Sequence, residues 1–145
     1  HIYVTGGWYG MMAHQLREVW PGDQMNITSA DMDPMCEYYA WGLFPDRDIS
    51  FETNDINDEI DFSKYTAIVN TSCEHMEHED LLSIVERKDP NAWVCFQTND
   101  YVDLDAHINC WPSAELFANS LNLEYTAYSG SLDLGDFNRH MVIGK

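Results

Sequence analysis

Two groups of residues in this chain have types and spacings that could support chemistry. The first is a glycine-rich run at residues 5–10, which reads Thr5-Gly6-Gly7-Trp8-Tyr9-Gly10. A glycine-rich turn between a strand and a helix lets a ligand approach the backbone and meet the helix N-terminus. The same residues can also form only a tight connection between the strand and the helix. If a ligand binds, this run indicates where it would lie.

An acidic residue follows the glycine run at a distance that suits a nucleotide-like ligand. Asp31 lies 21 residues after Gly10 and directly follows a predicted strand. A carboxylate at about this spacing can accept hydrogen bonds from both hydroxyls of a ribose. The alternative is a solvated strand end. For Asp33, two residues further on, we expect a structural role as the N-cap of a helix that begins at Pro34.

The second group lies at residues 70–76 and reads Asn70-Thr71-Ser72-Cys73-Glu74-His75-Met76. Histidine titrates near neutral pH and burial can raise the pKa of a glutamic acid, so Glu74 and His75 are candidate catalytic bases. Their alternative role is structural. His75 and His78 share a helical face, but their spacing matches no recognised metal-ligand pattern. Acidic residues at a helix start complement its dipole, so we predict no metal site here.

A third polar and aromatic segment follows the next predicted strand. It comprises residues 97–101 and residues 107–111, which contain His107 and Trp111. In open α/β sheets, ligands bind outside the carboxyl ends of the strands, which places this segment where an acceptor substrate would lie. His107 fits a base and a solvated loop residue equally well.

These residues need a scaffold, and the hydrophobic pattern alternates between short strand-like runs and helical runs. We predict helices at residues 11–20, 34–43, 78–87 and 112–121, the first of them stopped by Pro21-Gly22-Asp23. We predict strands at residues 2–4, 26–30, 49–53, 66–70, 92–97, 124–129 and 139–143. The alternation indicates a parallel sheet with right-handed crossovers, and the last two strands are close enough in sequence to pair antiparallel. The aromatic residues Trp93, Phe96 and Phe117 are expected in the core.

Five β-α units that end in an antiparallel hairpin resemble the class I S-adenosylmethionine (SAM)-dependent methyltransferases over nearly the whole chain. The resemblance implies a Rossmann-like α/β three-layer sandwich with a mostly parallel seven-stranded sheet. The implied strand order is 3-2-1-4-5-7-6, with the seventh strand antiparallel. It also implies that residues 1–145 form a single SAM-binding domain.

The resemblance assigns a role in cofactor binding to residues that follow the first four strands. The stretch Ala30-Asp31-Met32-Asp33-Pro34 resembles the second motif of the family, in which the acidic residue binds ribose and Met32 would pack against adenine. Asp55 would accept a hydrogen bond from the adenine amino group while Ile56 packs on the ring, although Asp55 also fits a plain surface charge. The remaining cofactor-binding residues implied are Thr5, Gly6, Gly7, Trp8, Gly10 and Asn70.

Two positions depart from the family pattern, which usually reads acidic-x-Gly-x-Gly-x-Gly around the first turn. Val4 stands where the family prefers a carboxylate, and Trp8 stands where it prefers the middle glycine. The resemblance implies methyl transfer from SAM to a small molecule or to a partner macromolecule. The two departures keep open a non-catalytic SAM- or nucleotide-binding module. A nicotinamide-dependent enzyme is disfavoured by the terminal hairpin, and the (Asp/Asn)-Pro-Pro-Tyr motif of DNA-base methylation is absent.

Composition limits the partners and the location that we expect. The chain has 25 acidic residues against 7 lysines and arginines, for a formal net charge of −18. Binding of extended nucleic acid depends on cationic side chains that neutralise phosphates, so we do not expect it. No apolar run reaches the ~20 residues of a membrane helix, and no leader sequence is evident. We therefore expect a cytoplasmic protein whose four cysteines are buried and reduced.

Overall fold

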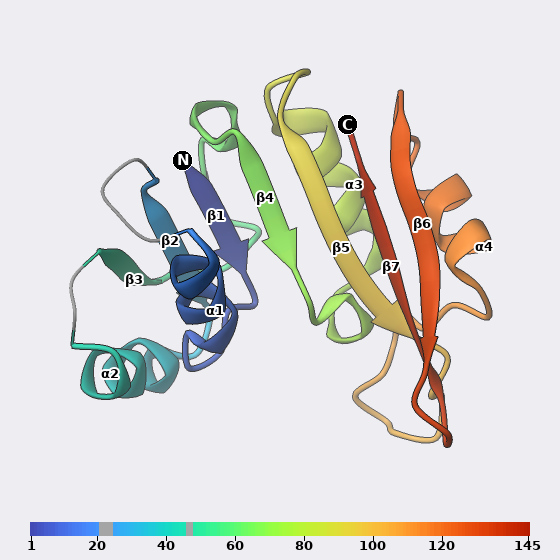
Figure 1. The fold of residues 1–145 in the computed structure, drawn as a ribbon, viewed down its shortest axis with the longest axis horizontal. Helices are drawn as coiled ribbons and strands as arrows, with labels where there is room; N and C mark the ends of the chain where they lie inside the picture. The colour runs from blue at the N-terminus through green and yellow to red at the C-terminus, as the bar shows by residue number, and fades with distance from the viewer. Residues whose placement is uncertain (21–24, 46–47) are drawn as a thin grey trace.

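The structure is a computed structural model that describes residues 1–20, 25–45 and 48–145. Its centre is a seven-stranded sheet in the order β3-β2-β1-β4-β5-β7-β6 (Figure 1), which confirms the predicted topology. The strands are β1 (Ile2–Thr5), β2 (Ile27–Asp31), β3 (Ile49–Thr53), β4 (Ala67–Asn70), β5 (Trp93–Asn99), β6 (Thr126–Asp133) and β7 (Asn138–Gly144). Strands β1 to β5 are parallel to one another, and β7 is antiparallel to both β5 and β6.

In the part of the chain that the structure describes, four α-helices cover the two faces of this sheet and make it a three-layer structure (Figure 1). They are α1 (Met11–Val19), α2 (Pro34–Leu43), α3 (His78–Arg87) and α4 (Ala114–Ser120), with short 3-10 helices η1 (Phe62–Lys64) and η2 (Cys73–His75). The predicted stop of the first helix at Pro21–Asp23 lies outside the described residues. The predicted start of α2 has a clear local cause. Asp33 accepts a hydrogen bond from the Met35 N–H at 2.9 Å, and Pro34 follows Asp33 as the first residue of the helix.

The two faces of the sheet are filled by different hydrophobic clusters. The face under α1 and α2 holds a smaller cluster that includes Ala13, Ala40 and Phe51. The face under α3 and α4 holds a larger cluster that includes Phe96 and Phe117, both fully buried as predicted. A parallel sheet needs cover on both faces, so its central strands are apolar on both sides.

The prediction that Trp93 lies in the core is wrong, because 37% of this residue is exposed. Trp93 is the first residue of β5, where it packs edge-on against Tyr125 with 6.3 Å between ring centroids. The Nζ atom of Lys145 lies over the same ring, 5.1 Å from its centroid. The indole therefore contributes to a surface cluster at the N-terminal end of β5.

All four cysteines are free, and Cys36 and Cys73 are buried while Cys95 and Cys110 are half-buried. Burial raises the pKa of the Cys36 thiol to about 11 and raises the pKa of the Cys73 thiol well above its usual value. Both thiols therefore stay protonated at neutral pH. Among the described residues, no helix has the length and apolar character that crossing a bilayer requires.

Candidate functional site

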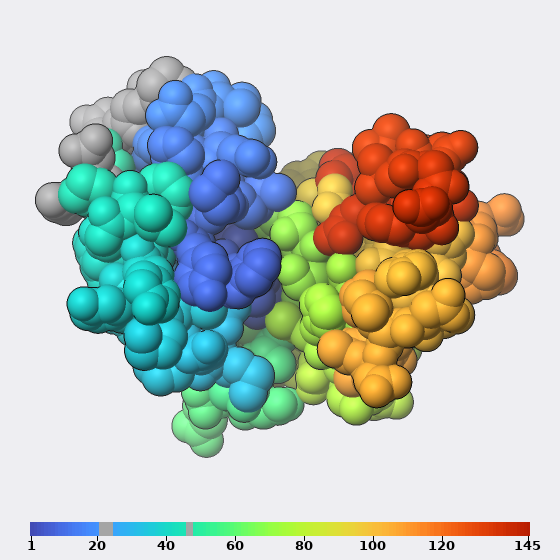
Figure 2. Space-filling view, turned by 90° about the horizontal axis from the view of Figure 1, so that it is seen from below, coloured from blue at the N-terminus to red at the C-terminus, as the bar shows by residue number. Residues whose placement is uncertain are grey.

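A cleft of about 780 Å³ opens at the carboxyl ends of the parallel strands. It lies where the chain order of the strands reverses, between β1 and β4, with the turn after β1 on one side and the segment after β4 on the other. Figure 2 looks onto this end of the sheet and shows the hollow between the N-terminal and C-terminal parts of the chain. Open α/β sheets bind ligands at this switch point.

Most of the residues predicted from the sequence meet in this cleft. The predicted cofactor residues that line it are Thr5, Gly6, Trp8, Asp31, Met32, Asp55 and Ile56. Both predicted catalytic residues, Glu74 and His75, line it as well. The other predicted cofactor residues, which are Gly7, Gly10 and Asn70, do not line it.

The turn after β1 depends on left-handed backbone at three of its residues. Gly6 has φ +59°, Trp8 has φ +50° and Gly10, which begins α1, has φ +81°. The left-handed region costs about 1–2 kcal/mol for a residue with a Cβ atom, whereas glycine adopts it freely. Trp8 thus has the backbone conformation of the glycine that the resemblance places there, and its side chain is 67% exposed.

Gly7 and Gly10 do not line the cleft, but they let the turn after β1 pack closely on its neighbours. A Cβ atom on Gly7 would overlap the Ser29 side chain, and one on Gly10 would lie 2.5 Å from Cε1 of Phe51. The Gly7 N–H donates to the Ala30 carbonyl oxygen at 2.9 Å, which ties the turn to the end of β2. Both glycines therefore allow close packing of backbone against the neighbouring strands.

Asp31 connects the turn after β1 to the segment that leads into α2. Its Oδ2 atom accepts a hydrogen bond from the Trp8 N–H at 2.9 Å, and its Oδ1 atom accepts one from the Asp33 N–H at 3.1 Å. Each carboxylate oxygen can accept more than one hydrogen bond, so both oxygens keep acceptor capacity toward the cleft. A structural role of Asp31 is therefore compatible with ligand binding.

The loop after β3 supplies a polar and an apolar part of the wall. The Oδ1 atom of Asp55 accepts a hydrogen bond from the Asn57 N–H at 2.9 Å, and this bond closes a tight turn. Ile56 is half-buried and packs against the larger core cluster. Met32 also lines the cleft and is 70% exposed. The apolar side chains of Met32 and Ile56 therefore share the cleft with the carboxylates of Asp31 and Asp55.

The side-chain amide of Asn70 holds the segment after β4 in place. Its Oδ1 atom accepts a hydrogen bond from the Ser72 N–H at 2.8 Å, and its Nδ2 atom lies 2.8 Å from the Sδ atom of Met76. The side chain is completely buried. These contacts fix the path of the backbone from β4 into η2, which carries Glu74 and His75.

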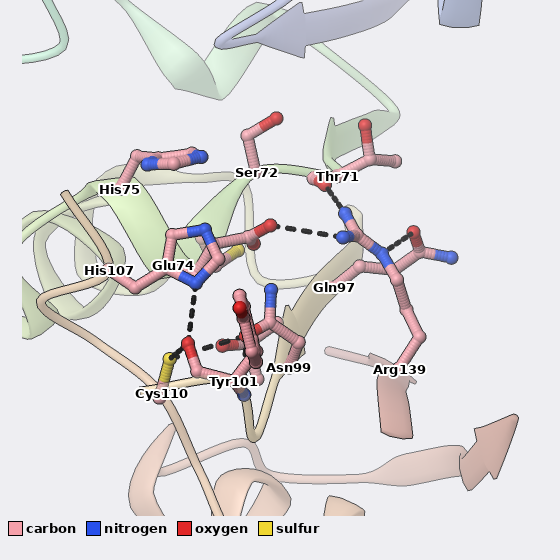
Figure 3. Close-up of polar contacts among 12 residues, drawn as sticks. Thr71, Ser72, Glu74, His75, Gln97, Asn99, Tyr101, His107, Cys110 and Arg139 are labelled. Carbon is pink, nitrogen blue, oxygen red and sulfur yellow. Dashed lines mark hydrogen bonds and ion pairs between the residues drawn. The ribbon is translucent and has the colours of Figure 1, made fainter. Parts of the chain in front are cut away.

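Arg139 lines the cleft, and the sequence did not indicate it. It lies on β7, and its Nη1 atom donates to Oε1 of Glu74 at 3.0 Å, while Nη2 donates to the Thr71 carbonyl oxygen (Figure 3). Only 5% of the Glu74 side chain is exposed, and its second oxygen, Oε2, is buried without a hydrogen-bond partner. Because Glu74 and Arg139 are 65 positions apart, no local pattern could pair them.

The histidine after Glu74 meets a second histidine from the loop between β5 and α4. The rings of His75 and His107 lie with centroids 4.8 Å apart and planes at 73°. The Nδ1 atom of His75 lies 3.0 Å from the Ala106 carbonyl oxygen, and Nδ1 of His107 lies 2.6 Å from the Tyr101 carbonyl oxygen. This loop returns to η2 through backbone bonds such as that from the Ile108 N–H to the Glu74 carbonyl oxygen, at 2.8 Å.

The electrostatic character of the cleft is acidic. Beside Asp31 and Asp55 it is lined by Glu77 and Asp80 from the start of α3, and Arg139, which also lines it, is paired with Glu74. Burial raises the pKa of Asp80, and the neighbouring Asp55 carboxylate raises it further. From the sequence we expected acidic residues at this helix start to complement the helix dipole, and the structure also places Glu77 and Asp80 in the lining of the cleft. A cleft with this charge favours cationic ligands.

No family model matches the sequence, and no curated protein is significantly similar to it. The fold has many relatives among solved structures. The complex of the Haloferax volcanii Trm112 methyltransferase activator with a methyltransferase matches with a TM-score of 0.79 and 14% identity, over 99% of this chain and 80% of the other. The chain has a methyltransferase fold.

Two further matches show how this fold is embedded in larger proteins. LepI in complex with SAM matches with a TM-score of 0.76 and 13% identity, over 99% of this chain and 42% of the LepI chain. The CurJ carbon methyltransferase matches with a TM-score of 0.76 and 12% identity, over 99% of this chain and 48% of the CurJ chain. This chain therefore spans less than half of either protein.

Proposed function

We propose that this chain binds SAM in the cleft and transfers its methyl group to an acceptor that binds beside Glu74 and His75. The observation that carries the proposal is the convergence of the glycine turn, Asp31 and the loop after β3 on one side of a single acidic cleft. The other side holds buried polar side chains. A cofactor and an acceptor can then meet in line across the switch point of the sheet.

The cofactor half fits the chemistry of SAM. Asp31 offers carboxylate acceptors to the ribose hydroxyls, and Met32 and Ile56 offer apolar surfaces to the two faces of adenine. Asp55 offers an acceptor to the adenine amino group. The sulfonium and the ammonium of SAM are cationic, so the carboxylates that line the cleft favour its binding. LepI, which has the same fold, is known in complex with SAM.

The acceptor half fits methyl transfer to a nucleophilic oxygen, nitrogen or carbon atom. In the reaction the bond between the sulfonium and the methyl carbon breaks, a bond from the acceptor to that carbon forms, and S-adenosylhomocysteine leaves. Alignment of the two reactants supplies most of the catalysis, and a base is needed only when the acceptor loses a proton. We assign the action on the acceptor to Glu74 and His75, which both line the cleft. The acceptor is a small molecule or a partner macromolecule.

Ligand-dependent stability tests the cofactor. We expect S-adenosylhomocysteine and SAM to raise the melting temperature, and NAD and ATP to leave it unchanged. Asp31→Asn keeps an acceptor for one backbone bond but removes the carboxylate, so the affinity for S-adenosylhomocysteine falls about tenfold or more. Asp33→Asn is the matched control, since Asp33 caps α2 and does not line the cleft. A folded chain that responds to neither sulfur compound contradicts the proposal.

Product formation separates an enzyme from a binding module. We expect S-adenosylhomocysteine to accumulate when the chain is incubated with SAM and a panel of hydroxyl, amine and carbon acids. Glu74→Gln abolishes that accumulation while binding of S-adenosylhomocysteine persists. Tight binding with no turnover on any acceptor, alone or with cell extract, indicates the non-catalytic module that Val4 and Trp8 left open.

A further inference from the structure

The cluster of Glu74, His75 and His107 beside the cleft has the composition of a metal centre. One ligand atom from each of these residues lies within 4.8 Å of the other two. Glu74 is buried, His107 is half-buried and His75 is exposed. Two imidazoles and one carboxylate form a ligand set that zinc uses at sites with an open fourth position.

The hydrogen bonds of the two histidines leave the same ring atom free on each. A carbonyl oxygen only accepts, so the Nδ1 atoms that contact the carbonyls of Ala106 and Tyr101 must carry the hydrogen. In the neutral ring the lone pair is then on Nε2. Metal-bound histidines are oriented in this way, with the second nitrogen donating to a carbonyl or carboxylate oxygen.

An independent observation supports Glu74 as the third ligand. Glu74 is 4% exposed, and its Oε2 atom has no hydrogen-bond partner. Its Oε1 atom is held by Arg139, so the carboxylate cannot turn away to satisfy both oxygens elsewhere. A buried carboxylate oxygen without a partner is costly, and a cation removes that cost.

We propose that Glu74, His75 and His107 bind a divalent transition-metal ion, for which Zn²⁺ is the probe (Figure 3). Ligand atoms around a tetrahedral zinc with bonds of about 2.1 Å are about 3.4 Å apart, so the cluster tightens slightly on binding. Exposed His75 has the freedom to make that movement. Arg139 remains as the outer partner that orients the Glu74 carboxylate.

Two side chains that could supply a fourth protein ligand, those of Cys110 and His78, already have other hydrogen-bond partners. The Sγ atom of Cys110 lies 3.3 Å from both Asn99 Oδ1 and the Tyr101 carbonyl oxygen, and burial raises the pKa of its thiol. His78, which the sequence pairs with His75, directs Nε2 to the Ser120 carbonyl oxygen at 3.2 Å. The fourth position is therefore left for water or for an oxygen atom of a ligand in the cleft.

The metal would give a specific role to the residues placed beside the acceptor. Glu74 and His75 would hold a cation that binds an oxygen atom of the acceptor, in place of taking its proton. This role rests on the proposed function, whereas cation binding itself does not. The experiment therefore measures zinc binding and S-adenosylhomocysteine binding separately on the same protein.

Equilibrium dialysis of the tag-free chain against Zn²⁺, with excess Mg²⁺ to occupy surface carboxylates, tests the site. We expect one tightly bound zinc per chain, with an affinity that falls by more than about tenfold in Glu74→Gln, His75→Asn and His107→Asn. The matched control, His14→Asn on α1, binds zinc like the unmodified chain. Absence of tight binding, or an affinity that any one of the three ligand variants leaves unchanged, overturns the proposal.

Cobalt substitution of the unmodified chain tests the ligands without any variant that could misfold. We expect the visible spectrum of four-coordinate Co²⁺ and two strongly shifted, exchangeable proton resonances, one from the Nδ1–H of each coordinated histidine. A spectrum of six-coordinate cobalt without such resonances overturns the proposal. Loss of zinc binding with intact S-adenosylhomocysteine binding would leave the proposed cofactor in place.

Discussion

The two sides of the cleft are built by different means. On the side of β1 and β2, the site is made of backbone: a turn with left-handed residues at Gly6, Trp8 and Gly10, tied to Asp31 by a single carboxylate. On the side of β4, β5 and β7, the site is made of side chains that pair across long sequence separations, with Arg139 and the buried Glu74 as the central pair. The first side is therefore sensitive to Cβ atoms, and the second is sensitive to charge.

Among the substitutions that test this difference, we expect removal of the Arg139 guanidinium to lower the free energy of unfolding most. Arg139→Met leaves the buried Glu74 carboxylate without a compensating charge, so the free energy of unfolding falls by about 3 kcal/mol. Denaturant unfolding measures the loss. The double variant Arg139→Met with Glu74→Gln removes both charges and should recover much of the stability. If the double variant is less stable than the single one, the pair is not the central interaction of this side.

A methyl group at Gly10 tests the backbone-built side. Gly10→Ala combines a left-handed φ of +81° with a Cβ atom 2.5 Å from Phe51 Cε1, so we expect a loss of about 2 kcal/mol in stability. Gly42→Ala on α2 is the matched control, because its Cβ atom would meet nothing within 4 Å. In a helix, alanine is about 0.5–1 kcal/mol more favourable than glycine. Equal effects of the two substitutions would contradict the strain argument.

The reverse substitution in the same turn should raise stability. Trp8→Gly relieves left-handed strain at an exposed residue, and the higher chain entropy of glycine offsets part of the gain, so the net increase is about 1 kcal/mol or less. Thermal unfolding of the apo protein measures it. A lower melting temperature for Trp8→Gly would mean that the Trp8 indole, which stacks on Tyr9, contributes more than the backbone costs.

The smallest effect that we expect is a pH dependence on the side-chain-built side. Hydrogen bonds from the Asn138 side-chain amide and then from its backbone N–H lower the pKa of Asp100 below its usual value. Its contribution to stability is complete above the pKa of the unfolded chain and is lost as the pH falls through the lower folded-state pKa. An NMR titration should show the Asp100 pKa rising toward normal in Asn138→Ala. No change would show that the amide does not stabilise the carboxylate.

The sequence predicted the scaffold well because each element has a local cause. The bounds of β3, α2 and α3 match the predicted ranges, since hydrophobic runs and the Asp33-Pro34 start are signals within a few residues. The turn after β1 was also predicted from its glycines, whereas the left-handed conformation of Trp8 was not. Trp93 was misplaced because an apolar residue at a strand end can face solvent, and periodicity does not tell which end is covered.

The side-chain-built half of the site escaped prediction for a physical reason. Glu74, His107 and Arg139 come from the segment after β4, the loop after β5 and the last strand, and only the folded chain brings them together. A pattern of spacings describes one helix face or one turn, so it pointed to His75 and His78. The structure turns these two histidines to different partners.

The position of β7 in the sheet has a consequence for the order in which the site matures during synthesis. This strand comes last in the described sequence, yet it lies between β5 and β6 and carries Arg139. On the ribosome, the glycine turn and Asp31 can form their contacts while the C-terminal strands are still untranslated. The Glu74 carboxylate can meet the Arg139 guanidinium only after β7 has been synthesised, because that strand carries Arg139. The side of the cleft that holds this pair is therefore completed only when β7 pairs with β5.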